Sequence, residues 1–312
     1  MFAARCIGIS LAGFVLLYAP LSAAIGLGWK PLWRGIRPQT ARGSANLLAA
    51  LRLAPLALAV IFTLLFTLPS FLILEPRATD EPLGTAPVLL GLCCLMLLAG
   101  GIFRTALAQI RTGQALLTWL ADSSVVEAGK PVPVFRTNAT APGITLAGVR
   151  KPRVLVSEAV LSVLTAQELR TALEHEVAHV RSHDNLKRLL FQLALFPGMK
   201  KLEDAWAEQA ELAADDAAVS NPMEALDLAA ALIKVSRLDF QAIGLTTGLL
   251  HSSTALSLRV QRLSAWKRIR LARTSLLNRL LLFPAAAIFL ATIVTYGSAL
   301  SGLHALTEWL VR

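Results

Sequence analysis

TAQELRTALEHEVAH, residues 165–179, is the stretch that decides the fold and the site predicted for this chain. Thr165 followed by Glu168 has the spacing of a capping box, in which each side chain bonds the backbone N–H of the other residue. A helix is therefore predicted to begin after Thr165 and to run to about Ser182. The rest of the stretch, including His-Glu-Val-Ala-His, lies on that helix.

The two histidines of this predicted helix are placed to bind one metal ion. His175 and His179 are four residues apart and so share a face one turn apart, as zinc ligands on a helix do. Glu176 lies about 100° further around the helix, outside the pair but near it. We expect Zn²⁺ as the cofactor and Glu176 as the general base that takes a proton from zinc-bound water.

A catalytic zinc ion needs a third protein ligand, which a second acidic helix near residues 203–220 can supply. Glu211 and Asp215 share a face of that helix. Glu211 is predicted to bind the metal, and Asp215 to accept a hydrogen bond from a ligand histidine. Glu208 lies three residues before Glu211 and stays open as the rival ligand.

The composition indicates a membrane protein. Of the 312 residues 55% are hydrophobic and 16% charged, and the mean hydropathy is +0.60. The net charge is +10, but the positive residues cluster beside the apolar runs, and no nucleic-acid-binding module occurs. Nucleic acid is therefore not an expected partner. Cys6, Cys93 and Cys94 lie in apolar stretches, which predicts neither a disulfide framework nor a cysteine zinc site.

Four apolar stretches are long enough to cross a bilayer, at residues 6–27, 53–74, 83–103 and 280–303. The expected fold class is mainly α, with membrane helices and an inserted α+β metallopeptidase domain of the zincin type. The predicted domains are three spans in 1–103, the zinc domain in 104–279, and a fourth span with a short tail in 280–312. Short β-favouring runs at 132–135, 144–146 and 154–156 predict a small sheet.

Lys and Arg cluster after the first span and around the polar region, at Lys30, Arg34, Arg104, Lys267 and Arg268 among others. The positive-inside bias therefore predicts an integral membrane protein whose catalytic domain is cytoplasmic. The expected location is a bacterial inner membrane. A cleaved signal peptide is the alternative for the first stretch, which has small residues at 22–24. Its apolar run continues to Leu27, however, and its positive charges follow the run rather than precede it.

Three further histidines have ordinary interpretations. His183 and its neighbour Asp184 are interpreted as a polar helix C-terminus rather than as part of the metal site. His251 lies in a Ser/Thr/Gly-rich stretch. It is interpreted as a solvent-exposed loop residue, with stabilisation of an oxyanion as the alternative. His304 is placed at or beyond the end of the last span, apart from catalysis.

Over residues 132–263 the sequence resembles the membrane-embedded zinc peptidases of the BlaR/MecR type. The matching motifs are KPRVLV at 151–156, LTAQEL at 164–169, HEVAHV at 175–180, Asp184, and ELAAD at 211–215. The resemblance implies the same ligands and base and adds Arg259 as a residue that lines the site. The related HtpX and CAAX-protease family shares these elements, but it usually has His-Pro where Ser253-Thr254 stands here.

The resemblance implies a zinc endopeptidase that cleaves a protein on the cytoplasmic side, such as a transcriptional repressor in a signalling pathway. BlaR/MecR sensors carry a penicillin-binding domain after the last span, whereas this sequence stops at Arg312. Sensing is therefore expected to fall to the membrane spans or to a separate partner. Quality-control proteolysis of membrane proteins and a non-catalytic zinc-binding receptor module are the alternatives.

Overall fold

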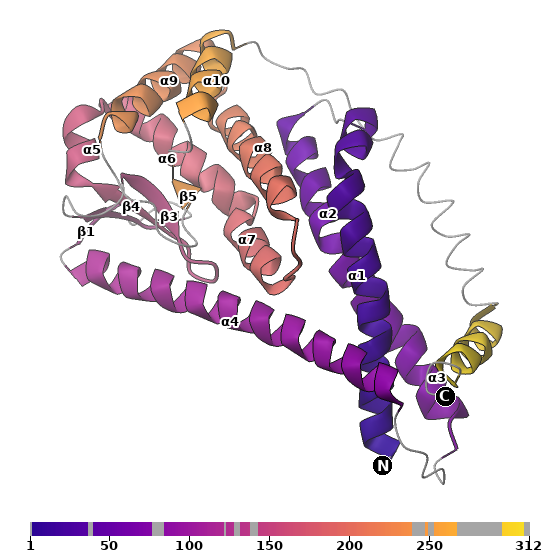
Figure 1. Ribbon diagram of the computed structural model, residues 1–312. Coiled ribbons are helices and arrows are strands. Elements are labelled where there is room, and N and C mark those ends of the chain that lie inside the picture. The colour runs from indigo at the N-terminus through magenta and orange to yellow at the C-terminus, as the bar shows by residue number, and fades with distance from the viewer. Residues whose placement is uncertain are drawn as a thin grey trace.

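The computed structural model describes residues 2–36, 40–76, 84–121, 123–127, 132–137, 143–238, 247–248, 253–266 and 295–308. These residues are mostly helical and include one small mixed sheet (Figure 1). The expected fold class is confirmed: long apolar helices accompany a compact region of sheet and helices.

In the described part of the chain, three helices are long and apolar enough to cross a membrane. The first is α1 (Phe2–Ile36), which runs without a break through the small residues at 22–24. The second is α2 (Ala41–Phe62), which continues through the π-helical turn η1 (Thr63–Thr67) into α3 (Leu68–Leu74). The third is α4 (Thr85–Ala121). The first two contain the first two predicted spans and extend beyond them, and α4 covers residues 85–103 of the third and continues to Ala121.

The fourth predicted span, 280–303, lies partly outside the described residues. Its last part belongs to a helix at residues 295–308, which is the yellow segment beside α3 in Figure 1. His251 also lies outside the described residues.

Helix α4 is much longer than its predicted span, which ends at 103. At about 1.5 Å per residue its 37 residues extend about 55 Å, against a bilayer core of about 30 Å. Near its end, Trp119 packs on Ala147 and Leu155 of the sheet. The helix therefore runs from the membrane region to the base of the sheet, with no break at residue 104, the predicted domain boundary.

The sheet has five strands in the order β1-β2-β4-β3-β5, and the three predicted runs correspond to β2, β3 and β4. The strands are β1 (Ser124–Glu127), β2 (Val134–Thr137), β3 (Ile144–Ala147), β4 (Arg153–Ser157) and β5 (Thr247–Gly248). Only β2 and β4 pair in parallel. The two-residue strand β5 pairs with the outer edge of β3.

Six helices surround the sheet and the site. They are α5 (Glu158–Val163), α6 (Ala166–Arg181), α7 (Asp184–Leu193), α8 (Lys200–Ala218), α9 (Pro222–Ser236) and α10 (Ser253–Ser264). The main core forms where α6 and α9 pack with the inner strands, around Val154, Ala172, Leu228 and Leu232. Burial of these apolar side chains holds α6 in place on the sheet.

Helix α8 also packs on the membrane helices. Leu202 and Trp206 of α8 contact Leu48 of α2 and Trp29 of α1 in one buried cluster. Arg52 of α2 is 3% exposed; it pairs with Glu203 of α8 at 2.7 Å and donates to the carbonyls of Phe191 and Ala194. The helix that carries Glu211 is thus fastened to a membrane helix.

Candidate metal centre

Helix α6 begins as its sequence predicts. Thr165 Oγ1 accepts from the backbone N–H of Glu168 at 3.3 Å, and Glu168 Oε2 accepts from the N–H of Thr165 at 2.8 Å. The capping box and the end of the helix near Ser182 are confirmed. His175, Glu176 and His179 are all buried on this helix, with 0%, 0% and 1% of their surface exposed.

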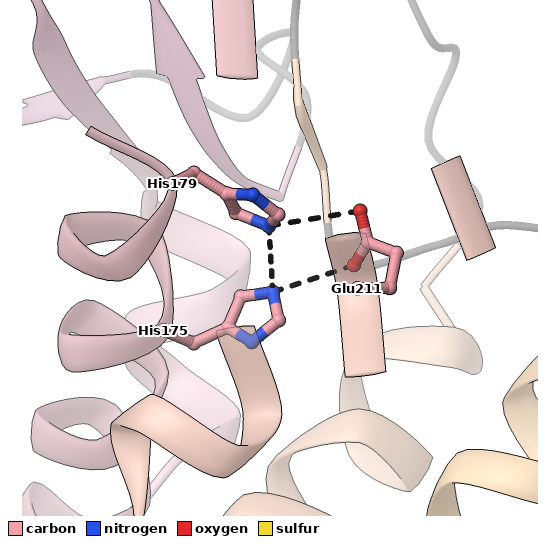
Figure 2. Close-up of side chains that lie close together, drawn as sticks. All are labelled: His175, His179 and Glu211. Carbon is pink, nitrogen blue, oxygen red and sulfur yellow. Dashed lines mark hydrogen bonds and ion pairs between the residues drawn. The ribbon is translucent and has the colours of Figure 1, made fainter. Parts of the chain in front are cut away.

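The Nε2 atoms of the two histidines point at a common space with the carboxylate of Glu211 (Figure 2). They are 3.2 Å apart, His175 Nε2 is 3.4 Å from Glu211 Oε2, and His179 Nε2 is 3.6 Å from Glu211 Oε1. Glu211 comes from α8, so the group joins two helices. The structure therefore brings together the three residues predicted to bind zinc, within 4.8 Å of one another.

These distances fit a zinc ion. Two bonds of about 2.0–2.1 Å at a tetrahedral angle separate their donor atoms by about 3.3 Å. Oε1 of Glu211 is buried and has no hydrogen-bond partner among the described residues. A buried polar atom left without a partner is costly, and a metal ion at the common point would satisfy it. The donor set is the one expected for an open, catalytic zinc site.

The other ring nitrogen of each histidine faces a carboxylate. His175 Nδ1 is 3.0 Å from Asp215 Oδ1, and His179 Nδ1 is 2.8 Å from Asp184 Oδ2. A carboxylate at Nδ1 holds the proton there and turns the Nε2 lone pair to the metal. The structure thus places Asp215 where it was predicted. For Asp184 it differs: the residue contacts a predicted ligand rather than simply ending a helix.

Arg259 of α10 lies behind the acidic residues and is 4% exposed. Its Nε and Nη2 bond the two oxygens of Asp215 at 2.8 and 2.7 Å, and its Nη1 is 3.1 Å from Glu211 Oε2. One buried guanidinium therefore holds both acids of α8, which agrees with a site-lining place for Arg259.

Glu208 lies elsewhere. It is exposed and lines a hollow with Trp29, Lys30 and Trp33 of α1. Glu208, the rival candidate for the third ligand, thus has other neighbours than Glu211, which lies beside both histidines. Of these two glutamates, Glu211 is the one whose carboxylate lies close enough to the histidines to share a metal ion with them.

The charges around the site shift the pKa values of its groups. Burial raises the pKa of Glu176 to about 7, and the nearby positive groups oppose this only in part. For His179, burial favours the neutral ring, but Glu211 and Asp184 outweigh it and raise the pKa. Asp215 has its pKa lowered despite burial, because Arg259 and His175 stabilise its charge. A carboxyl that titrates near neutral pH beside a metal site suits general-base chemistry.

A cavity of about 770 Å³ adjoins the site. Its lining includes Asp215 and Arg259, Arg42 at the start of α2 and Trp266 after α10, but neither histidine. The Asp215–Arg259 pair therefore separates this cavity from the histidines.

Two histidines and a glutamate on a helix pair, with a second buried glutamate beside them, are the donor arrangement typical of zinc metallopeptidases. In agreement, residues 125–237 match the model of Peptidase family M48, whose members are zinc metallopeptidases. The matched segment is just over a third of the chain and contains β2 to β4 and all of α6 and α8. No curated protein matches the sequence.

Proposed function

We propose that this chain is a membrane-anchored zinc endopeptidase that cleaves a protein substrate. The observation that supports the proposal best is the convergence of His175, His179 and Glu211 around one point, with buried Glu176 on the next helical position. Three ligands leave one coordination position for water, as in catalytic rather than structural sites.

Each residue has a role in this proposal. His175, His179 and Glu211 would hold the zinc ion, which when bound would polarise the scissile carbonyl and lower the pKa of the attacking water. Glu176 takes the proton of that water and later delivers it to the leaving amine. Asp215 and Asp184 hold the two imidazoles in the ligating tautomer. Arg259 balances the negative charge of Glu211 and Asp215.

The test is Glu176→Gln in the full chain purified in detergent, with zinc content and cleavage of an unfolded protein such as casein measured together. Zinc is expected to stay bound while cleavage falls at least about 100-fold, the typical contribution of a general base. Glu174→Gln, at a partly exposed position of the same helix, is the matched control and should change neither. Unchanged cleavage by Glu176→Gln would sink the mechanism.

The substrate is proposed to be a cytoplasmic protein, in the first place a transcriptional repressor in a signalling pathway. This rests on the positive charge beside the spans and on the BlaR/MecR-like motifs. Reporter fusions at Gly129 and Arg312 test the topology, and an external Gly129 would exclude a cytoplasmic substrate. An extended substrate would bind by adding a strand to an edge of the small sheet. At the β3 edge it would have to displace β5, which pairs with Thr145 and Leu146 there.

Quality-control cleavage of membrane proteins is the alternative enzyme function. Substrate trapping with Glu176→Gln separates the two: one defined captured protein supports the repressor, and many damaged proteins support quality control. If the chain is instead a receptor module that only binds zinc, the wild type should cleave neither a single defined protein nor damaged membrane proteins.

A further inference from the structure

A second group of metal-ligating side chains lies at the end of the membrane helices remote from α8 (Figure 1). It consists of Glu75, which ends α3, and of His304 and Glu308 on the helix at residues 295–308. Each residue offers a ligand atom within 4.8 Å of the others. His304 and Glu308 are four residues apart, so one helical face presents both.

Two atoms of this group are buried without a hydrogen-bond partner among the described residues. They are Glu75 Oε2 and His304 Nδ1. The side chain of Glu75 is only 3% exposed, and its Oε2 lies 3.8 Å from His304 Nε2. A buried carboxylate oxygen that faces an imidazole without a hydrogen bond is the arrangement that a shared cation completes.

The local charge also favours a cation. Arg5 Nη1 pairs with Glu75 at 2.9 Å and balances one of the two carboxylates. With both carboxylates ionised and His304 neutral, the group keeps one net negative charge. One imidazole nitrogen and two carboxylate oxygens form a donor set that zinc and similar borderline divalent ions accept.

The two segments that carry the ligands are held together independently of any ion. Ser70 Oγ donates to the carbonyl of Leu300 at 2.9 Å, and Tyr296 Oη donates to that of Leu65 at 2.6 Å. The ligands are therefore positioned before a metal binds, which lowers the cost of binding.

We propose that Glu75, His304 and Glu308 form a second binding site for a divalent metal ion of the zinc class. A bound ion joins the helix at residues 295–308 to α3 and, through the Arg5–Glu75 pair, to α1. The site is separate from the catalytic group and does not depend on proteolysis.

The test is a metal count on the full-length protein in detergent, stripped with a chelator and titrated with Zn²⁺ against a chromophoric competitor. The wild type should bind about two equivalents, and the double variant His175→Ala/His179→Ala about one. Adding His304→Ala to the double variant should abolish that remaining equivalent. Ser301→Ala, an exposed change on the same helix, is the control and should leave it in place.

A wild type that binds one equivalent, with none left in the double variant, overturns the proposal. So does retention of both equivalents by His304→Ala alone. Glu75→Gln leaves Arg5 without its buried counter-charge and endangers folding, so Glu308→Gln is the second variant. The catalytic equivalent that these variants keep shows that they are folded, whether or not the protein cleaves a substrate.

Discussion

The Nδ1 atom of His179 lies 2.8 Å from Oδ2 of Asp184, five residues further along the chain. A turn between α6 and α7 makes this contact possible. His183 adopts the left-handed conformation there, with φ of 55°, which is uncommon for any residue but glycine. Asp184 then starts α7 with its carboxylate directed back at α6. The backbone turn at His183 and the carboxylate of Asp184 therefore act together to orient the imidazole of His179.

Asp184→Asn should weaken zinc binding roughly 10–100-fold, because the histidine loses the charged acceptor that favours its ligating form. Competition titration with a chromophoric chelator measures this. Asp204→Asn, on the exposed face of α8, serves as the matched control. Equal affinities for the Asp184→Asn variant and the wild type would show that the contact does not tune the metal.

Glu211→Gln should remove tight zinc binding, whereas Glu208→Gln should leave it unchanged. The first side chain faces both histidines, and the second faces α1. A loss of about 10-fold or more in affinity is expected for the first variant, since an anionic ligand becomes a neutral one. Metal analysis after dialysis gives the answer, and the opposite ranking would reassign the third ligand.

Glu168 should make stability depend on pH. Burial opposes its ionisation, but hydrogen bonds from Lys234 Nζ at 2.7 Å and from Thr165 outweigh this and lower its pKa. A depressed folded pKa contributes stability that is full above the ordinary carboxyl pKa and is lost as the pH falls through the folded value. The thermal unfolding midpoint of the wild type should be higher than that of Glu168→Gln at neutral pH, and the difference between the two should shrink as the pH is lowered. A constant gap would contradict this origin.

Arg52→Met should destabilise the packing of α8 on α2 by about 3 kcal/mol, because two buried carbonyls and Glu203 lose a charged donor. Denaturation in detergent measures the change. Arg170→Met, at an exposed position of α6, is the control and should stay within about 0.5 kcal/mol of the wild type.

Local signals predicted much of this molecule. The capping box at Thr165 and the histidine spacing depend on neighbours in sequence, and the helix that they predict is present. The three apolar β runs likewise became strands. In contrast, β5 has two residues and exists only through its pairing with β3, so no pattern in its own sequence marks it.

Two residues could not be placed from the sequence, because their positions depend on tertiary contacts. Glu208 and Glu211 are equivalent by spacing, and only the packing of α8 against α1 separates them. Asp184 seemed an ordinary helix end because nothing in the sequence reveals the left-handed backbone of His183. The role of Asp184 could have been suspected from the resemblance, because Asp184, five residues after the second histidine, is one of the matching positions.

The donors of the metal centre come from two helices with different supports. Helix α6 rests on the sheet, whereas α8 is tied to α2 through Arg52 and Glu203, about 12 Å along the axis from Glu211. Ala41 of α2 also packs with Leu212 and Ala213 of α8, directly beside Glu211. The distance between the histidines and the third donor is therefore set jointly by two separate packing interfaces, one on the sheet and one on an apolar helix.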